Sequence, residues 1–308
     1  MPSTLKSILI AVPTTGARSV RPLLHELVQQ ARALESDGTH TVSVVLLDNS
    51  TTGSASARAA ADACGIECMR VARKGFAQVR NAALDTARTY AALVFIDDDE
   101  QPVPGWLHAL VATAEADDAD VVIGPVAVRL PPGAPRWLDE GRLIREVRTQ
   151  QDGPLQGFGQ SGNTLVRMSV VHRTQLRFDS AFDETGGEDA VFFNELVRQG
   201  ARLFFTRAAM VWETPDPERL TPTGVVRRAY RAGRTSVVVE AAIEDLSAPR
   251  RAVRRAGKGA RGLCRVLSGT VTARPVSCMR GLQDIAFVGG WALALVTSAG
   301  RRAVTGRQ

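Results

Sequence analysis

The first 130 residues alternate short, continuously apolar runs with segments of helical periodicity, and this alternation limits the fold more than any other feature. Strands that are buried on both faces have unbroken apolar sequences, and the helices between them act as crossovers between parallel neighbours. The sequence predicts strands over 7–12, 41–47, 66–71 and 91–96, and helices over 20–34, after residue 54 and over 78–87. We therefore predict an α/β fold with a mostly parallel central sheet flanked by helices.

Polar side chains follow three of these strands, and ligands of open α/β sheets bind at the carboxyl ends of strands. The residues at the predicted strand ends are Pro13 and Thr14, Asp48, and the run Asp97, Asp98 and Asp99. Adjacent carboxylates repel one another, and a hard divalent cation with an anionic ligand would offset that repulsion. A solvated acidic turn before the next helix is the alternative interpretation.

Beyond this region the pattern changes twice. Residues 130–160 are rich in Pro, Gly and Gln and are typical of a long functional loop region. Strand-like residues return at 162–166, followed by a helix opened by Gly186-Gly187-Glu188-Asp189 and by strand-like segments over 203–206 and 209–212.

The basic charge is concentrated at the C-terminal end. The chain carries 38 basic and 32 acidic residues, but from Leu246 onward there are twelve basic residues and only Asp284 is acidic. We predict a body over 1–245 and a basic helical tail over 246–308. An amphipathic stretch over 266–279 and an apolar segment over 285–299 favour the surface of an anionic membrane. A packed helical hairpin is the alternative, and nucleic acid is not expected.

No segment suggests export or a membrane span. The apolar run near the N-terminus covers only residues 8–12, and the longest uncharged apolar stretch, residues 285–299, is shorter than the roughly 20 residues that a spanning helix needs. The four cysteines are too few for a disulfide scaffold and form no zinc motif. We expect a cytoplasmic chain, peripheral on the inner face of the cell membrane.

Several motifs, in this order and spacing, resemble family 2 glycosyltransferases of the GT-A fold. The resemblance extends over roughly residues 7–240. It is carried by Ala11-Val12-Pro13, Val45 to Ser50, Gly75 to Asn81, Phe95 to Glu100, Pro104 to Leu107, Gly162-Asn163-Thr164, Gly186 to Asp189 and Arg227 to Arg234.

The resemblance implies a role for each matching residue. Asp97 and Asp99 correspond to the DxD carboxylates, with Asp99 as the more direct metal ligand, and Glu213 stands where many relatives have a metal-binding histidine. The implied contacts to the nucleotide sugar are Pro13, Thr14, Asp48, Arg80, Asp97, Asp98, Asn163, Arg231 and Arg234. Asp189 corresponds to the catalytic base, with Glu188 as its orienting neighbour or a second candidate. A helix N-cap, an Asx turn and surface arginines are the structural alternatives.

The resemblance thus implies an inverting hexosyltransferase that uses Mg²⁺ or Mn²⁺. A UDP-linked sugar is the favoured donor, and a lipid-linked or polysaccharide hydroxyl is the favoured acceptor. A phosphatase-like hydrolase that uses the DxD carboxylates, and a non-catalytic nucleotide- or membrane-binding module, are the alternatives. Such a phosphatase usually has its DxD motif after the first strand, whereas three strand–helix units precede it here.

Overall fold

The computed structural model describes residues 4–140, 143–144, 151–155, 160–183, 186–243 and 248–297. Its strands are β1 (Ser7–Thr14), β2 (Thr41–Asp48), β3 (Glu67–Arg70), β4 (Ala92–Phe95), β5 (Glu100–Pro102), β6 (Val121–Ile123), β7 (Val126–Val128), β8 (Gly153–Leu155), β9 (Thr164–Arg167), β10 (Leu203–Phe205) and β11 (Val211–Glu213). Its α-helices are α1 (Arg21–Glu35), α2 (Ala55–Cys64), α3 (Phe76–Thr86), α4 (Trp106–Ala116), α5 (Arg136–Glu140), α6 (Met168–Thr174), α7 (Glu188–Arg198), α8 (Pro222–Ile243), α9 (Ala248–Val271) and α10 (Pro275–Val296).

The chain divides into two compact units. The first comprises residues 1–127 and 146–213, and the second comprises residues 128–145 and 214–308. This division differs from the predicted boundary at residue 245, because α8 packs against α10 and so belongs with the C-terminal helices. Part of the predicted loop region 130–160 lies outside the described residues, and the described part includes α5 and β8.

The first unit is built on an eight-stranded sheet with the order β3-β2-β1-β4-β9-β6-β10-β8. Strands β3, β2, β1 and β4 are parallel neighbours, as the sequence predicts. Strand β9 is antiparallel to both β4 and β6, so the 162–166 segment enters the sheet in the opposite direction. The expectation of an α/β fold with a mostly parallel central sheet is confirmed.

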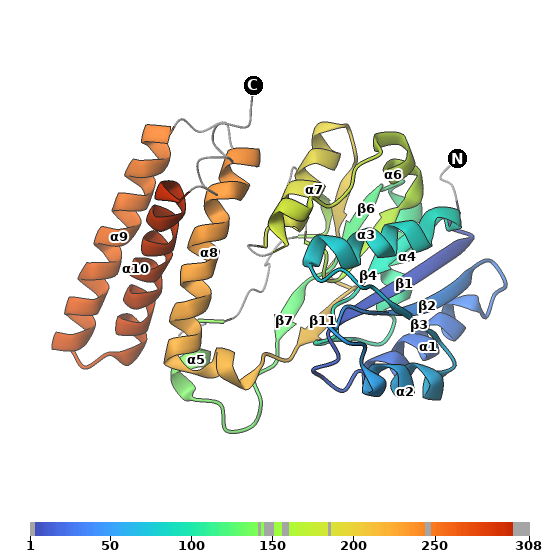
Figure 1. Cartoon of the computed structure of the whole chain (residues 1–308), viewed down its shortest axis with the longest axis horizontal. Coiled ribbons are helices and arrows are strands. Elements are labelled where there is room, and N and C mark those ends of the chain that lie inside the picture. The colour runs from blue at the N-terminus through green and yellow to red at the C-terminus, as the bar shows by residue number, and fades with distance from the viewer. Residues whose placement is uncertain are drawn as a thin grey trace. The chain divides into compact units, whose positions relative to one another are not determined.

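Alternate side chains of the central strands enter two separate cores. From β1, Ile8, Ile10 and Val12 pack with α1, α2 and α4, whereas Leu9 and Ala11 pack with α3, α6 and α7. Helices thus cover both faces of the sheet (Figure 1). This double burial explains why the strands are continuously apolar in sequence.

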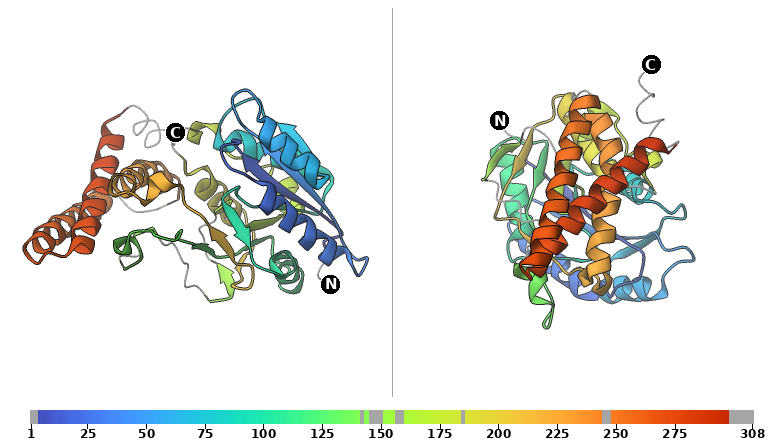
Figure 2. Two further views of the ribbon diagram at one scale, coloured as in Figure 1. Left: turned by 90° about the horizontal axis from the view of Figure 1, so that it is seen from below. Right: turned by 90° about the vertical axis from the view of Figure 1, so that its left-hand side faces the viewer.

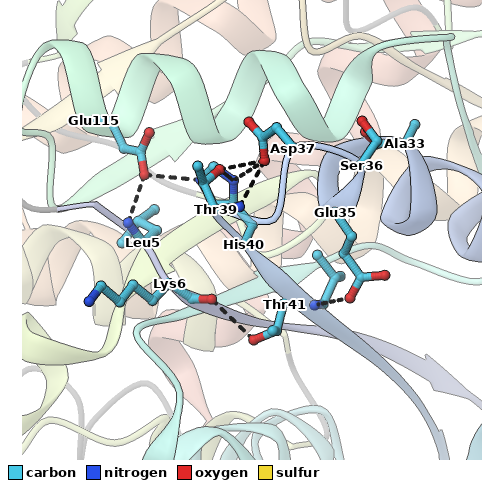
Figure 3. Close-up of polar contacts among 11 residues, drawn as sticks. Leu5, Lys6, Ala33, Glu35, Ser36, Asp37, Thr39, His40, Thr41 and Glu115 are labelled. Carbon is cyan, nitrogen blue, oxygen red and sulfur yellow. Dashed lines mark hydrogen bonds and ion pairs between the residues drawn. The ribbon is translucent and has the colours of Figure 1, made fainter.

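Polar contacts fix the end of the sheet where β1 and β2 begin (Figure 3). Glu115 Oε1 accepts a hydrogen bond of 2.6 Å from the Leu5 amide and lies 3.2 Å from His40 Nε2. The Glu35 carboxylate accepts a hydrogen bond from the Val42 amide at 2.8 Å. These contacts tie α1 and α4 to the starts of the strands, so His40 has a structural environment at the end opposite the predicted site.

The second unit is helical, with α10 between α8 and α9 (Figure 1). Helices α9 and α10 form a hairpin, seen from two further sides in Figure 2. The turn between them, residues 272–274, interrupts the amphipathic stretch predicted over 266–279, because Pro275 starts a new helix. The packed-hairpin alternative therefore describes the fold of the tail. No helix in the described ranges has the length and apolar character needed to cross a membrane.

Candidate active site

The carboxyl ends of β2, β1 and β4 bring the predicted polar residues to one edge of the sheet. Thr14 is in register with Asp48 across the β1–β2 pair. Thr14 Oγ1 donates a hydrogen bond of 2.6 Å to Asp98 Oδ2, which links the end of β1 to the acidic turn after β4. Pro13 is half-buried next to Thr14 in the same strand.

Asp48 forms the Asx turn that was the structural alternative for this residue. Its carboxylate accepts hydrogen bonds from the backbone amides of Ser50, at 2.9 Å, and Ser54, at 2.6 Å. Burial alone would raise the pKa of Asp48, but these serine hydrogen bonds lower it below its usual value. The side chain therefore holds the loop that follows β2, and its contact with a nucleotide base stays a prediction.

An acidic cluster of Asp97, Asp99, Glu100 and Glu213 lies at the same edge. Glu100 and Glu213 are directly paired in the antiparallel β5–β11 ladder, and Glu100 Oε2 accepts a hydrogen bond of 3.0 Å from the Asp97 amide. Burial first, then the charges of Asp97 and Glu213, raise the pKa of Asp99 to about 7. Burial, followed by neighbouring carboxylates, also raises the pKa of Asp97, although Arg80 opposes that rise, and it raises the pKa of Glu100 well above its usual value.

Glu100 is the member of the acidic cluster to which the sequence analysis assigned no role. It is only 5% exposed, and it closes a turn by bonding the backbone three residues earlier. Gly162 lies against this turn, since a Cβ at that position would be 2.7 Å from Glu100 Oε1 and 3.0 Å from Asp97 Oδ2. The Asp-x-x-Glu spacing is the signal that points to such a turn.

The acidic cluster suits a divalent cation by its charge and by its hard oxygen donors. Asp99 Oδ2 lies 3.8 Å from the Arg18 guanidinium, so this carboxylate already has a positively charged side chain beside it. Within the described residues, however, no three His, Cys, Asp or Glu side chains are arranged as a ready metal site. In proteins, Mg²⁺ is commonly held by one or two carboxylates together with water and substrate phosphates.

A buried ion pair connects α3 to the start of α7. The Arg80 guanidinium donates to Glu188 Oε1, and both side chains are nearly inaccessible to solvent. Burial raises the pKa of Glu188, an effect that Arg80 opposes and Asp189 reinforces. Arg80 is therefore not the surface arginine of the structural alternative, and the nearby Asp85 binds Arg177 at the surface.

Asp189 is more exposed than Glu188, and its charge contributes to the raised pKa of Asp97. Both residues lie in the first turn of α7, where the helix dipole favours negative charge. The structure thus brings Asp189, Glu188 and Arg80 to the same region as Asp97. Glu188 is 3% exposed and its Oε1 accepts from Arg80, whereas Asp189 is partly exposed. The role of either carboxylate as the catalytic base stays a prediction.

Asn163 is not accessible to a nucleotide sugar in this structure. Its side chain is 0% exposed, its Oδ1 accepts from Trp106 Nε1 at 2.6 Å, and its Nδ2 donates to the carbonyls of Pro125, at 3.0 Å, and Ala209, at 2.7 Å. We therefore leave Asn163 out of the proposed ligand contacts. Its side chain instead joins α4, β9 and the segments before β7 and β11.

We predict that Asn163→Ala destabilises the fold by roughly 3 kcal/mol or more, because buried donors and acceptors lose their partners. The backbone φ of 54° at this position adds to the cost, since asparagine tolerates left-handed conformations better than alanine does. Urea denaturation followed by circular dichroism measures the change. A loss of less than about 1 kcal/mol would contradict this structural role.

Arg231 and Arg234 are exposed residues of α8 in the second unit. Their implied contact with the nucleotide sugar stays a prediction. Glu213, in contrast, lies close to the DxD carboxylates, since its charge raises the pKa of Asp97 and Asp99. Its role as a metal ligand stays a prediction.

Comparisons with known proteins agree with this fold. The family model described as glycosyl transferase family 2 matches residues 9–174, more than half of the chain. The succinoglycan biosynthesis protein ExoM of Rhizobium meliloti (strain 1021) is 32% identical over 156 residues, which cover 51% of this chain and 50% of ExoM. The chain thus matches only about half the length of this relative.

Solved structures of low sequence identity share the fold. S. aureus TarS 1–349 in complex with UDP gives a TM-score of 0.52 at 14% identity, covering 93% of this chain and 90% of that one. GalNAc-T7 with UDP, GalNAc and Mn²⁺ gives a TM-score of 0.51 at 15% identity, covering 76% of this chain and 51% of that one. The α/β fold is of the GT-A type, and by its family match the chain belongs to glycosyl transferase family 2.

Proposed function

We propose that the chain transfers a hexosyl group from a UDP-linked sugar to a hydroxyl acceptor, with inversion at the anomeric carbon. The observation that carries the proposal is that Asp97 and Asp99 lie close to Asp189 and Arg80 at the carboxyl edge of the sheet. The UDP donor is supported by the TarS structures with UDP and with UDP-GlcNAc. A polysaccharide or lipid-linked acceptor is supported by the ExoM relative, which is named for succinoglycan biosynthesis.

Asp99 is the proposed metal ligand, with Asp97 and Glu213 beside it. Bound Mg²⁺ or Mn²⁺ would neutralise charge on the departing diphosphate. The raised pKa of Asp99 is consistent with this role, because a carboxylate crowded by others is stabilised by a cation. The GalNAc-T7 structure with Mn²⁺ also supports a divalent ion. Pro13, Thr14, Asp48 and Asp98 would border the nucleotide.

The proposed displacement needs a base on the acceptor side. The acceptor oxygen forms a bond to the anomeric carbon while the bond to the diphosphate oxygen breaks, and the acceptor proton passes to the Asp189 carboxylate. Arg80 holds Glu188 and so fixes the first turn of α7, from which Asp189 extends. Arg231 and Arg234 would add positive charge near the leaving diphosphate.

The proposed location is peripheral, on the cytoplasmic face of the cell membrane, where a lipid-linked acceptor is available. The excess of basic residues after Leu246 supports this location.

A panel of nucleotide sugars, each with Mg²⁺, Mn²⁺ or EDTA, tests the function. We expect metal-dependent release of one nucleoside diphosphate by the wild type and its loss in Asp99→Ala. Donor binding without any release, even with oligosaccharide and lipid-linked acceptors present, would favour the non-catalytic module. Failure to bind any nucleotide sugar would overturn the proposal. The phosphatase alternative is disfavoured by the family match and by the position of the DxD motif after β4.

A further inference from the structure

The C-terminal helices have their small residues inside and many of their large apolar residues outside. A Cβ on Gly281 of α10 would lie 2.5 Å from the carbonyl oxygen of Gly262 in α9, and a Cβ on Gly290 would clash with the carbonyl of Tyr230 in α8. The helices therefore meet through glycines, backbone against backbone. Helices of water-soluble proteins usually bury their large apolar side chains at such contacts, whereas small-residue contacts are typical of helices in lipid.

The large apolar side chains of α9 lie in one exposed stripe. Val253, Leu263, Leu267 and Val271 are 73%, 56%, 68% and 86% exposed. Their successive spacings of ten, four and four residues keep them within about 80° of one another around the helix, at about 100° per residue. The exposed Ala256 and Ala260 lie on the same side. This stripe is turned away from the glycines that contact α10.

Helix α10 continues the apolar surface. Leu282, Leu293 and Val296 are 40%, 44% and 64% exposed and recur at spacings of eleven and three residues, so they share one side of the helix. Leu282 also lines an apolar groove of about 500 Å³ between α8 and α10, together with Val226 and Tyr230. The stripe of α10 and the groove are therefore parts of one surface.

The cations of α9 lie on the face that borders this apolar surface. Asp284, about 200° around α10 from Leu282 at about 100° per residue, accepts a hydrogen bond of 2.6 Å from Arg265 and lies 3.7 Å from Lys258 Nζ. Arg261 shares the face of these two residues by its helical spacing. Helix α9 carries seven basic residues and no acidic residue within its bounds, Ala248–Val271. The apolar stripe and the cationic row are thus adjacent faces of one amphipathic helix.

We propose that the stripe Val253, Leu263, Leu267, Val271, Leu282, Leu293 and Val296 is a docking surface for an anionic lipid bilayer. The hairpin lies in the plane of the headgroups, with the leucines and valines in the acyl region and the arginines of α9 at the phosphates. Charge complementarity identifies the partner, because an acid-free helix beside an apolar stripe matches an anionic interface. The inference names the surface for the proposed membrane location and is independent of the transfer chemistry.

Flotation of the full chain with vesicles tests the surface, with phosphatidylcholine alone compared with phosphatidylcholine and phosphatidylglycerol. We expect binding to the anionic vesicles and a loss of about tenfold or more for Leu267→Glu and for Leu293→Glu, since each removes a leucine that the bilayer would bury and adds an acid. Arg261→Gln should weaken binding less and make it less sensitive to salt.

Leu295→Glu is the matched control. Leu295 is 38% exposed on the same helix, but it lies eleven residues from Asp284 and therefore on the cationic side. The Leu295→Glu variant should therefore bind the anionic vesicles nearly as well as the wild type. Asp99→Ala should also bind normally, which separates this inference from the proposed function.

Three results would overturn the proposal. The first is no binding to anionic vesicles. The second is binding that Leu267→Glu and Leu293→Glu leave unchanged. The third is a dimer in sedimentation velocity that these variants dissociate, with no vesicle binding, which would assign the surface to a second copy of the chain.

Discussion

Replacing Asp99 with asparagine is expected to stabilise the metal-free protein at pH 8 while abolishing metal-dependent turnover. The folded chain raises the pKa of Asp99 to about 7 from an ordinary value of 3.8, through burial and then the charges of Asp97 and Glu213. At pH 8 the wild type must therefore hold a carboxylate that its surroundings disfavour. The difference between the ordinary pKa and the raised pKa corresponds to at most about 4 kcal/mol of unfolding free energy.

The pH dependence has a definite sign. Because the folded state binds the Asp99 proton more tightly than the unfolded state, the wild type loses stability as pH rises from about 4 to about 7. Asp99→Asn lacks this contribution, so its advantage should be largest at pH 8 and nearly absent at pH 4. Thermal melts in EDTA across this range measure the difference.

Metal completes the test of Asp99. Mn²⁺ or Mg²⁺ with UDP should raise the melting temperature of the wild type and should have little effect on Asp99→Asn, and turnover should fall by roughly a hundredfold or more. Asp62→Asn removes the same charge from an exposed position of α2 and serves as the control. Equal melting temperatures for Asp99→Asn and wild type at pH 8 in EDTA would contradict the inference that the acidic cluster destabilises the metal-free protein.

The sheet could be predicted from sequence because burial on both faces leaves a strong signal. The predicted ends of β1, β2 and β4 lie within two residues of the observed ends, since their apolar runs stop where the polar site begins. The boundary at residue 245 differed from the observed division because the long helix α8 looks like part of the body until its packing against α10 is seen. The sequence does not indicate the turn at 272–274, because the apolar periodicity continues across it.

The site shows the same contrast between local and distant signals. The strand-end carboxylates could be identified because their neighbours along the chain are unambiguous. The resemblance implies a ligand contact for Asn163, whereas its partners in the structure, Trp106, Pro125 and Ala209, come from three separate segments. The pairing of Glu100 with Glu213 likewise depends on β5 meeting β11, a contact between residues far apart in sequence. No local pattern reports such pairings.

The second large effect is expected at Asp189. Asp189→Asn should reduce transfer by about a thousandfold, within the range of general-base removal, while leaving UDP-sugar affinity nearly unchanged. The structure explains why the variant should fold. Asp189 Oδ1 accepts from the Ala190 amide at 2.7 Å, and an asparagine oxygen can accept the same hydrogen bond.

Glu188→Gln is the matched comparison, because it removes the same charge one residue earlier. Its carboxylate is 3% exposed and paired with Arg80, so the substitution should destabilise the protein and weaken donor binding, as well as slowing turnover. The two variants therefore separate a catalytic residue from a positioning residue. Asp189→Asn should change kcat alone, whereas Glu188→Gln should change kcat, KM and melting temperature together.

Calorimetric titration with the donor and metal, beside a transfer assay on the same preparations, distinguishes the two roles. The charge of Asp189 contributes to the raised pKa of Asp97, so the two carboxylates lie close enough to act on the same bound substrate. If Asp189→Asn turned over within a few-fold of wild type while Glu188→Gln bound donor normally and was inactive, Glu188 would be the base. Arg80 would then have to release it when the donor binds, because in this structure the guanidinium occupies that carboxylate.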